Sequence, residues 1–210
     1  MENIRKNVIK DISGLIKDLK EQSTATIHEV MGKKGAMTSS IKPVLPGTKI
    51  CGQALTVKGG PSDNLMLIKA ISMAKEGQII VLDNGNIKDS GPFGEVLAVD
   101  CMSKGVQGLI TNGSVRDSKE IKKMNFPVYC TGFSIIGTTK VALGTINHPI
   151  SCGNVIVNPG DIVLGDDDGV VVIPEDIAVE VLRKAKDRDE KEVKVMDELR
   201  AGSSLFDIYG

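Results

Sequence analysis

The sequence predicts an α/β fold in which a partly parallel sheet is followed by an antiparallel layer and a long C-terminal helix. Strand-like and helix-like segments alternate through the middle of the 210-residue chain, which is typical of parallel strands joined by helices. The stretch NVIVNPGDIVLGDDDGVVVIP then gives short β runs split by Pro-Gly-Asp and Asp-Gly turns. Residues 174–202 are charged and periodic, as in a helix that ends at Gly202. Because no repeat or linker divides the chain, we expect one domain over residues 1–210.

The N-terminal part is expected to be helical over residues 1–35. Apolar side chains spaced three and four apart predict an amphipathic helix over residues 3–20, namely Ile4, Val8, Ile12, Ile16 and Leu19. Ser23 or Thr24 is a suitable cap for a second, short helix that ends at Val30.

The core elements follow in alternation. Residues 49–57 predict a strand, and the next segment predicts a helix with Ser62 as its cap and Gly77 as its stop. The remaining expected elements are a strand at 78–83, a helix from about 94 to 104, a strand at 108–111, a short helix from Asp117 and a strand at 127–130.

Composition narrows the class of protein. Hydrophobic residues make up 41% and aromatic residues only 3%, so the core must be aliphatic. Lys and Arg total 26 against 27 for Asp and Glu, and no basic block is present, which argues against nucleic-acid binding through the phosphate backbone. No apolar run reaches membrane-spanning length. We therefore expect a cytoplasmic protein without nucleic-acid or membrane partners.

Cysteine and histidine give little support for a metal or nucleophile site. The four cysteines are scattered without a C-x-x-C pair and are expected to be small core residues. The two histidines, His28 and His148, lack a second histidine at metal-ligand spacing. A Ser-His-Asp triad would have to use one of these two.

The first candidate site is the pair Arg116 and Asp117 in GLITNGSVRDSKEI. In one interpretation Asp117 caps a helix, with Glu120 completing a capping box. In the other, the pair lies beyond the carboxyl end of a strand, where ligands collect in open α/β sheets. An Arg there binds a carboxylate bidentately, and an Asp holds a hard cation such as Mg²⁺.

The second candidate is GPFGEVLAVD, residues 91–100. Its glycines, including Gly94, let the backbone approach a ligand, and the free N–H groups around Glu95, Val96 and Leu97 form an anion site. The alternative is that Glu95 only complements the helix dipole. If both helix starts converge on one crevice, the combination fits a small metal-chelating acid such as a 2-oxo acid.

The chain resembles the regulator of ribonuclease activity A-like family. That family includes the 4-hydroxy-4-methyl-2-oxoglutarate aldolases and proteins misnamed as demethylmenaquinone methyltransferases. The resemblance covers nearly the whole chain and rests on STATIHEVMG, IKPVLPGTKICGQALTV, GEVLA, NGSVRD, NPGDIVLGDDDGVVVIP and LRAGSSLFDIYG, in the family's order. The family signature is an acidic residue, twenty intervening positions and Arg-Asp, which Glu95 and Arg116-Asp117 match. The family usually has Asp where this chain has Glu95.

The resemblance implies a three-layer β/β/α swivelling domain that assembles as a homotrimer or homohexamer. It implies that Asp117 is the direct Mg²⁺ or Mn²⁺ ligand and that Glu95 holds metal-bound water. Glu192, from the C-terminal helix of a neighbouring subunit, would also approach the metal through water, although Glu190 lies only two residues away. Arg116 would bind the carboxylate or keto oxygen of the substrate, and the backbone at Gly94, Val96 and Leu97 would bind the pyruvyl carboxylate.

The implied activity is retro-aldol cleavage of 4-hydroxy-4-methyl-2-oxoglutarate-type 2-oxo acids to pyruvate, catalysed by a divalent metal, with oxaloacetate decarboxylation through the same enolate. Two alternatives stay open. One is a non-catalytic protein that binds and regulates a ribonuclease, as the family's namesake does. The other is a methyltransferase, but no glycine-rich strand-to-helix turn followed by an acidic strand end is evident for an adenosyl cofactor.

Overall fold

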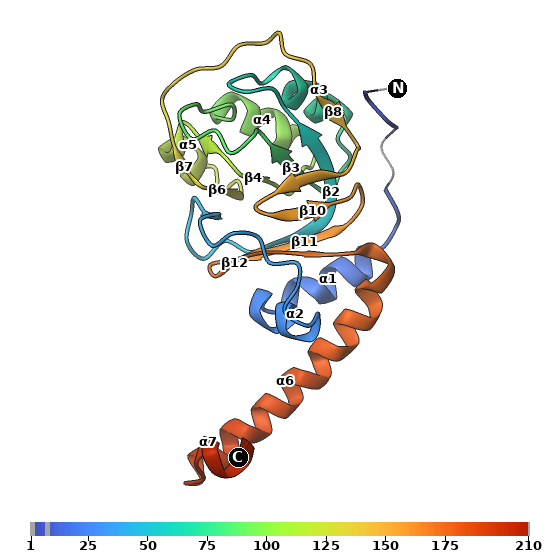
Figure 1. Cartoon of the computed structure of the whole chain (residues 1–210), viewed down its shortest axis with the longest axis vertical. Helices are drawn as coiled ribbons and strands as arrows, with labels where there is room; N and C mark the ends of the chain where they lie inside the picture. The colour runs from blue at the N-terminus through green and yellow to red at the C-terminus, as the bar shows by residue number, and fades with distance from the viewer. Residues whose placement is uncertain (1–2, 7–8, 210) are drawn as a thin grey trace.

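A mixed sheet forms the centre of the molecule (Figure 1). The computed structural model describes residues 3–6 and 9–209. The strand order is β1-β6-β4-β3-β2-β11-β12, and β8 also pairs with β2. The bounds of these strands are β1 Lys42–Pro43, β2 Ile50–Lys58, β3 Gln78–Asp83, β4 Gly108–Thr111, β6 Val128–Cys130, β8 Thr145–Ile146, β11 Ile162–Asp166 and β12 Gly169–Ile173.

The sheet has a parallel half and an antiparallel half, as the sequence predicts. Strands β2, β3, β4 and β6 run parallel, with Leu55 opposite Ile80 and Ile80 opposite Leu109. Strand β11 pairs antiparallel with both β2 and β12. The carboxyl ends of the parallel strands therefore lie at one edge of the sheet, where a ligand site is expected.

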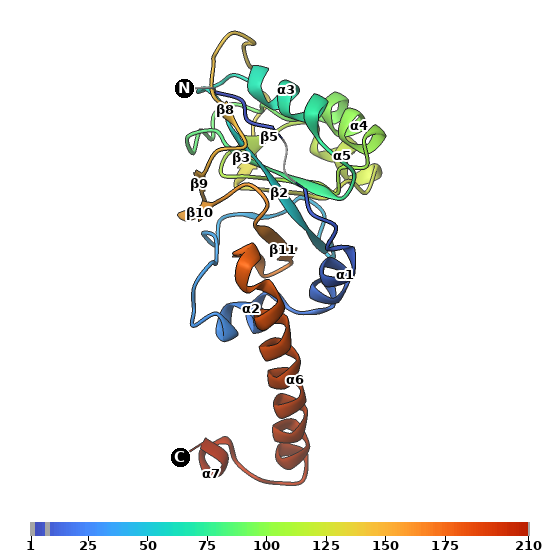
Figure 2. The same cartoon turned by 90° about the vertical axis from the view of Figure 1, so that its right-hand side faces the viewer.

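Helices cover one face of the sheet and a β-hairpin covers the other (Figure 2). The helices are α3 Leu65–Met73, α4 Glu95–Ser103 and α5 Ser118–Lys123, and the hairpin consists of β9 Ile150–Cys152 and β10 Val155–Val157. Leu67, Ala98 and Ile121 are buried on the helical face. Val81 and Cys152 are buried together on the hairpin face. The result is a three-layer β/β/α domain.

Two N-terminal helices close the antiparallel end of the sheet. They are α1 Ser13–Glu21 and α2 Thr24–Val30, and Ser23 caps α2 by accepting the Thr26 N–H at 2.9 Å. Their buried side chains pack on β11, β12 and the start of the C-terminal helix α6, as Leu19, Ile27, Leu164 and Val181 show.

The long C-terminal helix stands clear of the body over most of its length (Figures 1 and 2). Helix α6, Ala178–Arg200, follows the short 3₁₀ turn η1, Glu175–Ile177. Its buried side chains all lie in its first third, the last being Ala185. The short helix α7, Leu205–Tyr209, follows at its far end. The predicted C-terminal helix is confirmed over Ala178–Arg200, whereas the start of the predicted range 174–202 forms the 3₁₀ turn. Only the first third of α6 packs on the body.

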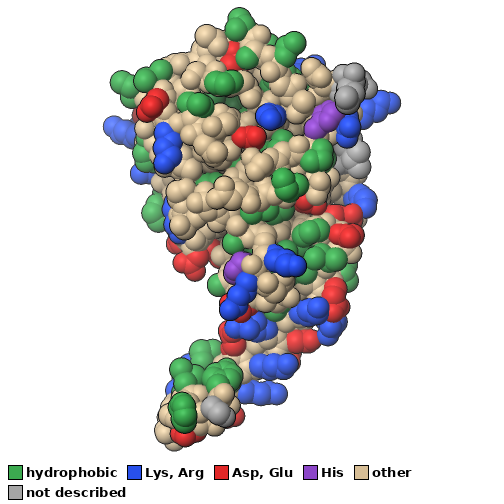
Figure 3. Space-filling model, viewed as in Figure 1, with side chains coloured by type: hydrophobic (Ala, Val, Ile, Leu, Met, Phe, Trp, Pro, Cys, Tyr) green, Lys and Arg blue, Asp and Glu red, His purple; other side chains and the backbone are tan. Residues whose placement is uncertain are grey.

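Hydrophobic side chains gather at this far end of the molecule (Figure 3). Val193 and Met196 are exposed on α6, and Leu205, Phe206 and Tyr209 are exposed on α7, with 82% of Phe206 accessible. An isolated chain gains nothing from an apolar surface of this kind, whereas an interface would bury it.

The structure corrects the prediction of a helix over residues 3–20. Helix α1 begins only at Ser13. Ile4 instead forms a parallel bridge with Ile146, and the Lys10 backbone exchanges two hydrogen bonds with the Gln53 amide. These tertiary contacts satisfy the backbone of an extended strap. Val8, which the predicted helix included, lies outside the described residues.

The predicted cap of α3 is also wrong. Ser62 has a φ of 50° and lies before the helix, while Asp63 accepts the Leu65 N–H through Oδ1 at 2.8 Å. Its other oxygen, Oδ2, accepts the Thr139 hydroxyl at 2.6 Å and the Val141 N–H at 2.7 Å. Asp63 therefore links the start of α3 to the loop over residues 134–144.

All four cysteines are buried and free, as expected. Burial raises the pKa of Cys51, Cys101 and Cys152 to about 12 and that of Cys130 to about 11. Such thiols stay protonated and unreactive at neutral pH. In the part of the chain that the structure describes, no helix is long and apolar enough to cross a membrane.

Candidate functional site

The two helix starts singled out in the sequence meet at one edge of the sheet. The short strand β5, Ser114–Val115, runs parallel to β7, Gly132–Phe133, and leads into Arg116. The Arg116 N–H donates to the Phe93 carbonyl at 2.9 Å, which joins the segment before α4 to the segment before α5. Two stretches that are more than twenty residues apart in the sequence are thereby held side by side.

Asp117 makes the contact that defines the site. Its Oδ2 accepts the Glu95 N–H, the first of helix α4, at 3.0 Å, and Arg116 Nε lies 3.6 Å from the same oxygen. Asp117 has a φ of 55°, in the left-handed region, and its side chain makes no capping bond to its own helix. The capping-box interpretation with Glu120 is therefore wrong, because the carboxylate reaches across to α4 instead.

Gly94 is required for this approach. A Cβ on Gly94 would overlap the Asp117 carboxylate and lie 2.9 Å from Arg116 Cγ. Gly91 is equally confined, since its Cβ would lie 2.6 Å from the Ser134 carbonyl oxygen. The glycines predicted to let the backbone approach a ligand instead let it approach the Arg-Asp pair.

The start of α4 keeps free donors beside the pair. The first backbone bond within this helix runs from the Ala98 N–H to the Gly94 carbonyl. The N–H groups of Val96 and Leu97 are therefore left without an acceptor inside the helix. The sequence analysis predicts that these N–H groups bind an anion.

The pair lines a small open pocket of about 150 Å³, together with residues that the sequence analysis did not single out. The side chains of Arg116 and Asp117 are 45% and 38% exposed. The opposite wall consists of Phe133, Ser134 and Ile135. The sequence could have indicated Phe133, Ser134 and Ile135, because they follow the predicted strand at 127–130 and therefore lie at the same carboxyl edge of the sheet as Arg116.

A buried hydrogen-bond network fixes the frame beneath the pocket. Asn112 donates through Nδ2 to Asp83 Oδ1 at 2.8 Å and accepts the Asn84 N–H through Oδ1 at 3.0 Å. The Thr131 N–H donates to the Gly113 carbonyl at 3.0 Å. The turns after β3, β4 and β6 are thereby tied to one another, which limits movement of Arg116 and Asp117.

The third carboxylate of the sequence hypothesis is not part of this group within one chain. Glu192 lies on the free part of α6 and accepts Arg188 Nη2 at 2.7 Å. Over residues 3–6 and 9–209, no three His, Cys, Asp or Glu side chains gather closely enough to hold a metal ion. The oxygen ligands that one chain offers here are Asp117 and Glu95.

Comparison with known proteins places this arrangement in a family. The model of the RraA-like family, described as Aldolase/RraA, matches residues 24–172. A protein of Halalkalibacterium halodurans with the provisional name 4-hydroxy-4-methyl-2-oxoglutarate aldolase is 35% identical over 182 residues, covering 85% of this chain and 87% of the relative.

Solved structures share the fold. A Streptomyces coelicolor protein, described as an unusual member of the RNase ES inhibitor RraA protein family, superposes with a TM-score of 0.79 at 24% identity, covering 90% of this chain and 98% of its own. An uncharacterized Pseudomonas syringae protein superposes with a TM-score of 0.82 at 22% identity, covering 97% and 98%. The matched region includes both helix starts of the site, and the chain belongs to the RraA-like, Aldolase/RraA family.

Proposed function

We propose that the protein is a divalent-metal-dependent lyase that cleaves 4-hydroxy-4-methyl-2-oxoglutarate-type 2-oxo acids to pyruvate, with oxaloacetate decarboxylation as a side activity. The observation that carries the proposal is the contact of Asp117 Oδ2 with the Glu95 N–H beside Arg116. It holds the Arg116–Asp117 pair, which lines the pocket, against the start of α4, where Glu95 and the N–H groups of Val96 and Leu97 lie. The provisional name of the Halalkalibacterium halodurans relative supports the same class of reaction.

The residues present suit Mg²⁺ or Mn²⁺. Asp117 has its Oδ2 engaged by Glu95 and Arg116, and no hydrogen bond within the described chain engages its Oδ1. Glu95, whose backbone N–H meets Asp117, has an exposed side chain. Hard divalent cations prefer such oxygen ligands and keep several waters, for which the open pocket leaves room. When bound, the metal would act as a Lewis acid on the 2-oxo acid.

The remaining groups have distinct tasks in this scheme. The N–H groups of Val96 and Leu97 bind the carboxylate next to the keto group, and Arg116 adds a positive charge near the oxygen on which negative charge develops. The bond between C3 and C4 breaks, its electron pair passes into the pyruvate enolate, and the C4 hydroxyl loses its proton to become a ketone. In this scheme a water held by Glu95 and by Glu192 of a neighbouring subunit accepts that proton.

A neighbouring subunit completes the site in this proposal. Arg116 and Asp117 are too exposed in one chain to exclude water from a reactive enolate. Val96, Val99 and Met102 form an exposed apolar stripe on α4 beside them. The free part of α6, with Glu192 and its exposed apolar side chains, is the segment we expect to cover this region in a homotrimer or homohexamer.

Pyruvate release tests the proposal. The substrates are 4-hydroxy-4-methyl-2-oxoglutarate and oxaloacetate, assayed with Mg²⁺ and with EDTA. We expect turnover that EDTA abolishes and that both Arg116→Ala and Asp117→Ala lose, while the surface control Asp168→Ala retains it. Turnover no greater than that of free metal would rule out the substrate class.

A non-catalytic regulator of a ribonuclease is the second candidate. The observation that favours it is the long exposed arm formed by α6 and α7, together with the described role of the Streptomyces coelicolor structural relative. Binding of a ribonuclease by the Asp117→Ala variant, combined with absent lyase turnover, would favour this function.

A further inference from the structure

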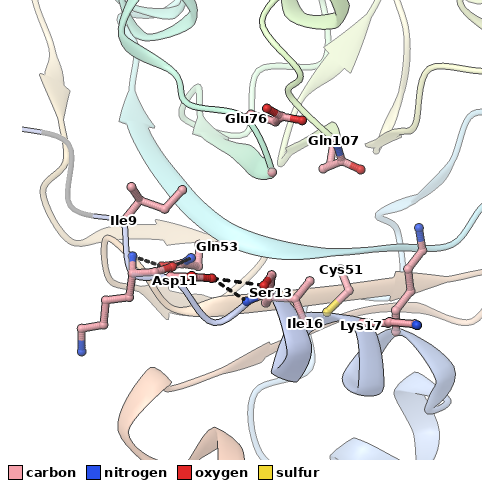
Figure 4. A pocket seen from close by; sticks show the side chains of 12 residues that line it. Ile9, Asp11, Ser13, Ile16, Lys17, Cys51, Gln53, Glu76 and Gln107 are labelled. Carbon is pink, nitrogen blue, oxygen red and sulfur yellow. Dashed lines mark hydrogen bonds between the residues drawn. The ribbon is translucent and has the colours of Figure 1, made fainter.

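A second and larger cavity lies at the opposite edge of the sheet from Arg116 and Asp117. It has a volume of about 620 Å³, within the usual range for small-molecule sites. Figure 4 shows α1 and the strap before it on one side and Glu76 and Gln107 on the other, with β2 between them. Because Gly77 and Gln107 immediately precede β3 and β4, the cavity opens at the amino ends of the parallel strands.

Most polar groups in the cavity wall are already satisfied. Gln53 exchanges hydrogen bonds with the Lys10 backbone at 3.1 and 2.8 Å, and the Lys10 ammonium pairs with Glu175 at 2.6 Å. Asp11 accepts the Ser13 hydroxyl at 3.1 Å. With these groups engaged, the wall presents mainly the apolar surfaces of Ile9, Ile16 and Cys51 and the lysine stems.

Two lysines that lie one turn apart on α1 carry the cavity's unpaired positive charges. In the described chain, Lys17 and Lys20 on α1 have no ion pair or side-chain hydrogen bond, and both line the cavity. Two carboxylates of the lining also have no ion pair in the described chain: Asp11, which accepts from Ser13, and Glu76 on the opposite wall. The positive charge of Lys20 acts to lower the pKa of Cys51, which lines the same cavity, against the larger opposing effect of burial.

We propose that this cavity is a binding site for a small monocarboxylate with an apolar body, such as a medium-chain fatty acid. The apolar wall takes the hydrocarbon chain, and the ammonium groups of Lys17 and Lys20 hold the carboxylate at the rim. The site is separate from the lyase pocket, so its occupancy does not depend on the proposed reaction.

Calorimetry with three ligands of one chain length tests the charge preference. Octanoate should bind the native protein saturably with one site per chain, and neutral octanamide about tenfold more weakly, because it loses the interaction with two partly exposed lysines. In Lys17→Glu/Lys20→Glu, octylammonium should bind more tightly than octanoate. Lys69→Glu, on the exposed surface of α3 and outside the cavity, should keep the native preference.

Fluorescence tests the location. The sequence contains no tryptophan, so Gln107→Trp would place a single reporter in the exposed wall of the cavity. Octanoate should shift its emission with the midpoint found by calorimetry, while Lys69→Trp should not respond. The proposal is overturned if native protein shows no saturable octanoate binding, if the double variant binds octanoate as Lys69→Glu does, or if the Gln107→Trp emission stays constant during binding.

Discussion

Asp117 is held by a contact across the fold, because its Oδ2 accepts the first N–H of α4 while its backbone precedes α5. The motif spacing singled out Glu95, Arg116 and Asp117 correctly as neighbours in space. It could not show that Asp117 takes a left-handed backbone conformation and bonds α4 rather than α5, because both features depend on the strand pairing that precedes them. Local sequence alone favours the capping box, and the tertiary contact replaces it.

Gly94 gives the sharpest prediction at this scale. In Gly94→Ala the new methyl group overlaps the Asp117 carboxylate and must displace it. We expect pyruvate release to fall by about a hundredfold or more, the cost of misplacing a catalytic group by about an ångström. Steady-state kinetics on the folded variant measure this.

Gly14→Ala is the matched control. Gly14 lies inside α1 with open space around it, so the same added methyl group should leave turnover unchanged and raise the stability of the helix by up to about 1 kcal/mol. Native turnover in Gly94→Ala would show that the contact between Gly94 and Asp117 is irrelevant to function.

At the scale of elements, the strands and helices of the core were predicted well, and the connections between them were not. β3 and α4 follow from a buried apolar run and a clear helix start. The segment before α1 shows where hydrophobic periodicity fails as a predictor. Its apolar spacing fits a helix, but its backbone pairs with β8 and with the Gln53 side chain. Nothing in the sequence of residues 134–144 indicates that this loop is held by hydrogen bonds to the distant Asp63.

Asp63 should hold that loop in place. It is 3% exposed, and burial alone would raise its pKa, but the hydrogen bonds from Thr139, Val141, Leu65 and Ala142 outweigh this and lower the pKa to about 2. In Asp63→Asn one of the two accepting oxygens becomes an NH₂ group, which donates and cannot accept, and we expect a loss of about 1–3 kcal/mol in the free energy of unfolding. Urea denaturation at pH 7 measures the loss.

The pH dependence follows from the same shift. Because the folded pKa lies below the unfolded value near 3.8, the ionised Asp63 stabilises the fold fully above that value and loses its effect as pH falls toward about 2. The stability difference between native protein and Asp63→Asn should therefore shrink over this window. A difference that stays constant from pH 5 to pH 2 would contradict the assignment.

At the scale of the whole molecule, the free arm is the feature that a single chain leaves unexplained. Sequence periodicity predicts the length of α6. It does not indicate which part of the helix packs on the rest of the same chain. The proposed site needs Glu192 from a neighbour, which makes the active unit an oligomer. A charged helix pattern alone does not distinguish a solvated face from a shared interface.

Mixing two inactive variants tests this sharing. Asp117→Ala and Glu192→Ala should each have low turnover, and subunit exchange at equal amounts should restore about a quarter of the native activity, because that fraction of sites pairs a native Asp117 with a native Glu192. A second substitution on α6, Arg183→Ala, is the control for non-specific effects of changing this helix. Failure of the exchanged mixture to exceed its parents would mean that the two residues do not act in one site.

If Asp117 and Glu95 hold a divalent cation beside Arg116, the protein must bind Mn²⁺ at this site in the absence of substrate. Electron paramagnetic resonance of free Mn²⁺ during titration measures binding without any assumption about the substrate. We expect one Mn²⁺ per chain in the native protein and tighter binding when the enolate mimic oxalate is added. Asp117→Ala should lose both effects, and Asp168→Ala should keep them. Equal Mn²⁺ binding by native protein and Asp117→Ala would contradict this assignment.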